Sequence, residues 1–151
     1  MSQSSLKVLY ISHSHPPDES PLENMGGMQR VSMQLVQALE DNPTVEIQTI
    51  IQKAPWKGIE SRTLLFLLKL RRQIPQFVGS FKPDVILFSS MVTASMARWL
   101  KGKVSIPMVT INHGQDVTMP YGWYQKHVSK VLNALDGVIS VSQATRQACI
   151  D

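Results

Sequence analysis

The chain has 151 residues, of which 43% are hydrophobic and 17% charged, and this composition excludes a wholly disordered protein. Its length suffices for one domain, and its net charge of +4 is only a modest basic bias. The single cysteine, Cys149, excludes an intramolecular disulfide, and the longest apolar run, 64–68, is far shorter than the roughly 20 residues that span a bilayer.

Short apolar runs rich in β-branched residues alternate with stretches of helical periodicity along the whole chain. A strand is predicted first, followed by a loop rich in histidine, proline and acidic residues and then by an amphipathic helix. The predicted strands cover 7–12, 45–51, 84–89, 107–112 and 137–142. The predicted helices cover 28–39, 60–81, 93–100 and 124–135, and another begins at 143. Pro75 is expected to kink or divide the second helix, because proline lacks an N–H and clashes with the preceding turn.

Strands that alternate with helices predict an α/β fold with a Rossmann-like, doubly wound parallel sheet of about five strands and helices on both faces. Ligands of such sheets bind at the carboxyl ends of the strands. The sequence stops about two turns into its last predicted helix, without a glycine to end it. We therefore expect one incomplete lobe over 1–151, with more protein following it in nature.

The first candidate site follows the first strand. Gly26 and Gly27 begin a helix, where exposed N–H groups and the helix dipole favour an anion such as a diphosphate. A flexible loop entering a helix is the simpler alternative. His13, His15 and Asp18 match the known patterns of metal ligands poorly, so no metal site is expected. Of the two histidines, His15 is expected to line the ligand cleft at the carboxyl ends of the strands.

Two further candidates follow the fourth and fifth strands. Asn112 ends the fourth predicted strand, and His113 and Asp116 follow it. An imidazole at this place can donate a hydrogen bond to a substrate oxygen, and a carboxylate can orient it or bind a sugar hydroxyl. A purely structural histidine is the alternative. After the fifth strand, Ser142 is expected to cap the last helix, and Arg146 is expected to face the cleft from its first turn.

A dinucleotide-dependent dehydrogenase is disfavoured by two features of the same region. Its fingerprint is G-x-G-x-x-G directly after the first strand, whereas a long loop and adjacent glycines occur here. It also needs an acid at the end of the second strand, where this chain has Ile51, Gln52 and Lys53.

Four segments taken in order resemble the amino-terminal lobe of the retaining glycosyltransferases of family 4, also called group 1. They read KVLYIS, GGMQRVSMQLVQAL, TINHGQD and DGVISVSQATR, and only 53–72 matches nothing specific. The resemblance implies the acceptor-side lobe of a GT-B enzyme, in which two Rossmann-like lobes face each other. The donor lobe, with its E-x-x-x-x-x-x-x-E signature, is absent, so the chain alone is expected to be inactive.

The resemblance also implies roles for the candidate residues. Gly26 and Gly27 would approach the diphosphate of a nucleotide sugar, while His113 and Asp116 would lie beside the transferred sugar. The full enzyme would transfer a hexose-type sugar to a saccharide or lipid-linked acceptor in glycan or polysaccharide biosynthesis, with neither a metal nor another cofactor. Asn112, His15 and Arg146 remain further substrate-binding candidates.

The positive charge is concentrated in one stretch. Its cationic residues are Lys53, Lys57, Arg62, Lys69, Arg71, Arg72 and Lys82. A solvated helix surface with the opposite face buried on the sheet is favoured, and peripheral membrane contact through 62–72 is the alternative. No nucleic-acid partner is expected, because no recognisable module accompanies the charge. The expected location is the cytoplasm, with the inner face of the membrane as the alternative.

Two other function classes stay open. A non-catalytic sugar-binding or scaffold module would also use this fold. A nucleotide-sugar epimerase shares the two-lobe architecture, although it needs acid and base groups for which the loop ends offer mainly His113 and Asp116.

Overall fold

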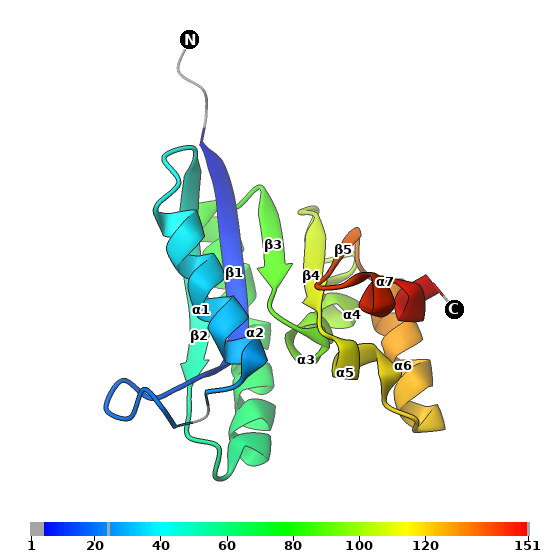
Figure 1. The fold of residues 1–151 in the computed structure, drawn as a ribbon. Helices are drawn as coiled ribbons and strands as arrows, with labels where there is room; N and C mark the ends of the chain where they lie inside the picture. Colours follow the sequence, from blue (N-terminus) through cyan, green and yellow to red (C-terminus); the bar gives the residue numbers. More distant parts are fainter. Residues whose placement is uncertain (1–4, 24, 151) are drawn as a thin grey trace.

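Strands and helices alternate throughout the computed structural model, which describes residues 5–23 and 25–150, with Ser14 described by its backbone alone (Figure 1). The strands are β1 (Leu6–His15), β2 (Val45–Lys53), β3 (Val85–Phe88), β4 (Met108–Asn112) and β5 (Gly137–Ser140). The helices are α1 (Gly27–Glu40), α2 (Ile59–Phe81), α3 (Met91–Ala94), α4 (Met96–Leu100), α5 (Gly114–Thr118), α6 (Gly122–Leu132) and α7 (Gln143–Ile150).

The five strands form one parallel sheet in the order β2-β1-β3-β4-β5, so the predicted doubly wound α/β fold is confirmed. The chain places β2 on one side of β1 and the later strands on the other. The order therefore reverses between β1 and β3, and ligands of open parallel sheets bind beyond the carboxyl ends of the strands at such a switch point.

Side chains of β1 alternate between two helical layers. Leu9 and Ile11 face the main core, which also holds the α2 residues Leu70 and Ile74. On the other face, under α1, the hydroxyl group of Tyr10 lies 2.6 Å from that of Ser32. The prediction that the helix at 60–81 buries one face on the sheet is therefore confirmed.

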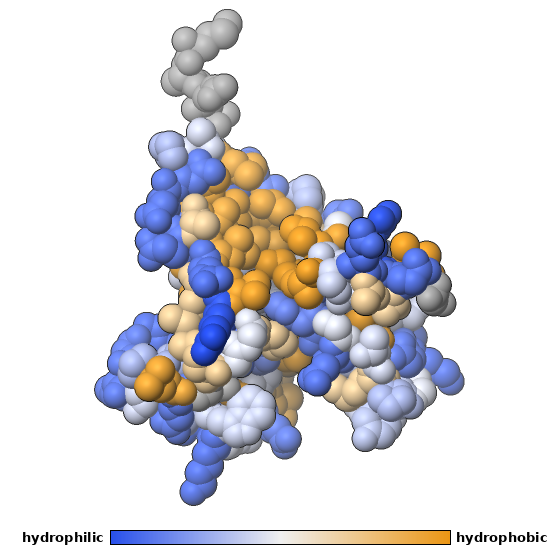
Figure 2. Space-filling model, in the orientation of Figure 1, coloured by the Kyte–Doolittle hydropathy of each residue, from blue (hydrophilic) through white to orange (hydrophobic). Residues whose placement is uncertain are grey.

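The sheet face beside α1 stays apolar and partly exposed over β3, β4 and β5, as Figure 2 shows. Leu87 pairs with Val109 and Ile111 with Ile139, so these side chains share one face. Ile139 is 53% exposed. Within the described residues no helix covers this part, although strands of parallel sheets usually bury both faces.

Strand β1 is longer than the predicted strand at 7–12. It continues to His15, with a register irregularity between Ser12 and His15 where it pairs with β2. The placement of His13 and His15 in a loop was therefore wrong, because pairing with β2 continues beyond the apolar run that signals a strand.

Helix α2 runs without a break through Pro75, so the expected division of this helix was wrong. Pro75 is exposed and removes only one backbone hydrogen bond. Ile74 lies in the core, and Phe77 packs against it, so sheet contacts hold the helix on both sides of the proline.

The region after β3 and β4 also differs from the prediction. The predicted helix at 93–100 is divided into α3 and α4, and the expected loop after β4 contains the short helix α5. Helices of four or five residues show too little of the 3.6-residue period to be recognised from sequence.

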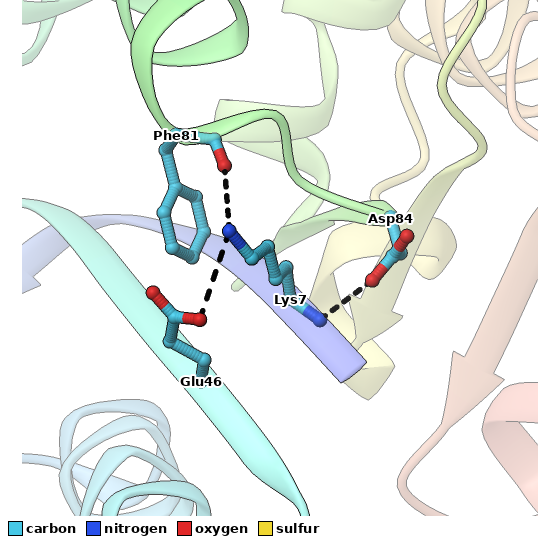
Figure 3. A network of polar contacts seen from close by, with 4 residues as sticks. All are labelled: Lys7, Glu46, Phe81 and Asp84. Atoms are coloured by element: carbon cyan, nitrogen blue, oxygen red, sulfur yellow. Dashed lines mark hydrogen bonds and ion pairs between the residues drawn. The ribbon is translucent and has the colours of Figure 1, made fainter. Parts of the chain in front are cut away.

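Two aspartates stand one residue before a strand and hold its register. Asp84 Oδ2 accepts a hydrogen bond from the Lys7 N–H at 2.8 Å, and the Asp84 N–H donates to the Lys7 carbonyl at 2.8 Å. Lys7 also reaches Glu46 and Phe81 with its ammonium group (Figure 3). Asp136 exchanges the same two bonds with Met108, at 2.9 and 2.8 Å, and thereby joins the start of β5 to β4.

Replacing Asp136 with alanine should lower the free energy of unfolding by about 1–2 kcal/mol, because the part-buried N–H of Met108 would lose its acceptor. Urea unfolding followed by circular dichroism measures this loss. Asp41→Ala is the control, since Asp41 accepts only an exposed side-chain bond from Gln37. Equal loss in both variants would contradict a register role for Asp136.

Candidate functional site

A hollow of about 580 Å³, here called the Gly–Asp cleft, lies where three chain segments meet beyond the carboxyl ends of β1, β2 and β4. It is lined by Met25, Gly26, Gly27, Met28, Gln29, Trp56, Gln115, Asp116 and Met119. The structure thus brings together three residues that the sequence singled out, although 90 residues separate Gly26 from Asp116. Only the order of the strands in the sheet brings these two residues close together in space.

The glycines of the cleft begin α1 and differ in what they do. The Gly26 N–H donates to Gln29 Oε1 at 3.0 Å, and a Cβ on Gly26 would lie 2.8 Å from that oxygen. A Cβ on Gly27 would meet nothing within 4 Å. The N–H groups of Gly27 and Met28 lie in the first turn, where no earlier helical carbonyl can accept them. The start of α1 therefore offers donors and a positive dipole end to an anion in the cleft.

Asp116 is a buried carboxylate held by two backbone donors. Its Oδ2 lies 3.3 Å from the His113 nitrogen and 3.4 Å from the Met91 nitrogen, so it joins the start of α5 to the start of α3. Burial raises the pKa of Asp116, while these two N–H groups and the charge of His113 oppose the rise. The carboxylate is thus oriented toward the cleft before any ligand arrives.

His113 precedes α5 and turns its ring toward the end of β3. Its Nε2 lies 3.2 Å from the carbonyl oxygen of Ser89, which can only accept. The neutral ring therefore carries its proton on Nε2 and leaves Nδ1 as an acceptor. The backbone N–H of His113 contacts the Asp116 carboxylate, but His113 is not among the residues that line the Gly–Asp cleft.

His15 points under α1, away from the Gly–Asp cleft. Its Nε2 lies 2.6 Å from Ser32 Oγ, the atom that also contacts Tyr10. Burial lowers the pKa of His15, and the positive charge of Lys53 lowers it further. His15 lines a separate hollow between α1 and β2.

Asn112 and Arg146 also lie outside the cleft. Asn112 is fully buried and donates from Nδ2 to Cys149 Sγ at 3.4 Å. Arg146 is exposed and lines a different hollow beside β5. The predicted cap at Ser142 is confirmed, because its Oγ accepts the Thr145 N–H at 3.1 Å.

Comparison with known proteins identifies the family. Residues 25–151 match the model of the family described as Glycosyltransferase Family 4. The chain belongs to this family. No curated protein matches it significantly.

A solved structure shows the same fold. It is a crystal structure described as a UDP-N-acetylglucosamine 2-epimerase from Listeria monocytogenes, with a TM-score of 0.59 and 14% sequence identity. The match covers 97% of this chain and 42% of that one. The family 4 chain described here therefore corresponds to less than half of that protein.

His13 is a residue of this family 4 chain that the site prediction omitted. It is buried at the switch point, where its Nδ1 lies 3.4 Å from Ser90 Oγ after β3. Burial lowers the pKa of His13 to about 4, and the charge of His15 contributes. The sequence signal was the H-x-H pair, whose first histidine could be placed only by knowing that β1 continues past Ser12.

Trp56 was missed for a different reason. It is 67% exposed and lines the Gly–Asp cleft from the connection between β2 and α2. An exposed indole offers a flat apolar face to a ligand in such a hollow. It lies in 53–72, the stretch that resembled nothing, so only its position in the structure shows its relation to Asp116.

The part of the chain that the structure describes contains no group of three or more metal-ligating side chains. No helix there is long and apolar enough to cross a bilayer. The expectation that no metal is needed stays a prediction.

Proposed function

We propose that this chain is the amino-terminal, acceptor-side lobe of a retaining glycosyltransferase that transfers a hexose-type sugar from a nucleotide sugar to a saccharide or lipid-linked acceptor. The observation that carries the proposal is the meeting of Gly26, Gly27 and Asp116 in one hollow at the carboxyl ends of parallel strands. Membership of family 4 supports it. The groups that hold the nucleotide would belong to a second, donor-side lobe.

Each part of the cleft has a distinct task in this proposal. The first turn of α1 stabilises the departing diphosphate through the N–H groups of Gly27 and Met28. Asp116 accepts a hydrogen bond from a sugar hydroxyl, and Trp56 packs against the apolar face of the acceptor. His113 positions Asp116 through its backbone N–H. The cleft contributes positioning and charge stabilisation.

Sugar transfer is tested with the complete gene product and a panel of nucleotide sugars and acceptors. The Gly27→Asp variant should raise the donor KM about tenfold or more, because its carboxylate repels a diphosphate at the start of α1. The helix itself should remain stable, since an acid in the first turn suits the dipole. Gly79→Asp is the matched control, because Gly79 is an exposed glycine in α2 that also has room for a side chain.

Three outcomes would count against this function. An unchanged donor KM in Gly27→Asp would remove the start of α1 from the donor site. Interconversion of a nucleotide sugar without any acceptor would favour an epimerase. Transfer by residues 1–151 alone would contradict the proposed need for a donor lobe.

We also propose that the exposed side of α2 contacts anionic membranes, where a lipid-linked acceptor would be found. Leu64 and Leu68 are 61% and 51% exposed, and Arg71 and Arg72 are exposed on the same helix. The chain should co-sediment with phosphatidylserine vesicles at low salt, and Leu64→Glu should weaken this binding severalfold. Neutral vesicles are the control, and failure to bind anionic vesicles at low salt would refute the contact.

A further inference from the structure

A second hollow, here called the edge hollow, lies between α2 and the outer strand β2. Its volume is about 400 Å³. From β2 it is lined by Gln52, which shares a face with the buried Ile50. Helix α2 contributes Arg62, Leu65, Lys69 and Gln73, which recur at helical spacing. None of these side chains was assigned a role in the Gly–Asp cleft.

Three buried amide atoms of the edge hollow lack partners. Both amide atoms of Gln52 and the Oε1 of Gln73 are buried and have no hydrogen-bond partner in the described part of the chain. Leaving buried amide groups unpaired is costly, and native proteins rarely do so. The hollow thus presents one donor and two acceptors to whatever occupies it.

The charge of the edge hollow is entirely positive. Arg62 and Lys69 are exposed at its opening, and no acidic residue lines it. Lys53 also lines the hollow and is paired with Asp18 at 2.7 Å, whereas no ion pair of Arg62 or Lys69 occurs among the described residues. Two cations without carboxylate partners beside unpaired amides favour an anionic ligand that also carries hydroxyl groups.

We propose that the edge hollow binds an anionic saccharide unit, a sugar that carries a phosphate or a carboxylate. A sugar hydroxyl donates and accepts at once, which matches the unpaired amide atoms of Gln52 and Gln73. The C–H face of the sugar packs against Leu65, and its anionic group pairs with Arg62 and Lys69. Water would satisfy the amides alone, whereas an anionic sugar would satisfy them and also pair with both cations.

The edge hollow is separate from the Gly–Asp cleft although the two are close along the chain. Ala54 lines the edge hollow and Trp56 lines the cleft, so the two sites border the same connection between β2 and α2. Saccharide binding in the edge hollow does not depend on the proposed sugar transfer, and it is measurable without turnover.

Binding is measured by titration calorimetry and ligand-observed NMR on the 151-residue chain. The probes are glucose 6-phosphate, glucuronic acid, neutral glucose and inorganic phosphate. We expect each anionic sugar to bind about tenfold or more tightly than glucose, and more tightly than phosphate. Comparison of glucose 6-phosphate with glucuronic acid shows whether the site prefers a phosphate or a carboxylate. Phosphate binding equal to that of glucose 6-phosphate, or no binding of either anionic sugar, would overturn the proposal.

Variants locate the site. Gln73→Leu and Lys69→Gln should each weaken binding of the preferred anionic sugar about tenfold, whereas Lys69→Arg should retain it. Gln73→Leu removes a buried unpaired oxygen, so its melting temperature should not fall. Arg71→Gln is the matched control, because Arg71 is an exposed cation of α2 outside the hollow. An equal loss of affinity in Arg71→Gln would mean that binding reflects nonspecific charge attraction, and it would contradict the proposed site.

Discussion

Replacing Asp116 with asparagine in the complete enzyme is expected to lower kcat/KM about 100-fold, equivalent to about 2.7 kcal/mol of lost transition-state stabilisation. Asparagine keeps the shape and can still accept the N–H groups of His113 and Met91. What it removes is the negative charge in the Gly–Asp cleft, and charge-assisted hydrogen bonds to a sugar hydroxyl are roughly twice as strong as neutral ones.

Stability separates this role from a structural one. Burial raises the pKa of Asp116, so the ionised carboxylate is disfavoured in the folded protein, and Asp116→Asn should not lower the melting temperature at pH 7. Glu60→Gln is the control, since Glu60 is an exposed acid in the first turn of α2. Full activity in Asp116→Asn would remove Asp116 from the site, and a large fall in melting temperature would assign it to structure.

Acid is expected to destabilise the chain through His13. The pKa of His13 falls from 6.5 in an unfolded chain to about 4 in the fold, because the ring is buried. The unfolded state therefore binds the proton more tightly. The stability that His13 contributes is present above pH 6.5 and is lost as the pH falls toward 4. Between pH 7 and pH 4.5 this loss amounts to about 2 kcal/mol.

Urea unfolding of the wild type and His13→Gln at both pH values isolates this contribution. Carboxylates titrate in both proteins, so the difference between the two pH dependences belongs to the histidine. The variant should lose about 2 kcal/mol less than the wild type on acidification. Parallel pH dependences would show that His13 is accessible to protons in the folded state.

The fold could be predicted because its signals are local. Apolar runs of strand length alternate with amphipathic stretches, and such alternation leaves the doubly wound parallel sheet as the usual arrangement. The first and last residues of the strands and helices were harder to predict. Strand β1 continues to His15 through pairing with β2, and α2 passes Pro75 because the sheet holds both of its halves. Both effects depend on partners distant in sequence.

The candidate site was predicted in part. Why some of its residues were predicted and others were not has a physical cause. Gly26, Gly27 and Asp116 were found because strand ends that precede a helix are recognisable, and a parallel sheet gathers its carboxyl ends on one edge. The sequence does not show in which direction a side chain at the end of a strand points. His113 turns to Ser89 and His15 to Ser32, so neither lines the cleft with Asp116.

The sequence by itself determined the α/β class, the family resemblance and the glycines at the start of α1, since each depends on residues close together in the chain. Tertiary structure decided which of the candidates meet. It placed Trp56 in the Gly–Asp cleft, buried His13 at the switch point and left both amide atoms of Gln52 and the Oε1 of Gln73 unpaired in the edge hollow. These outcomes depend on strand order and on packing between elements, because hydrogen-bond partners and burial arise only when distant segments come together.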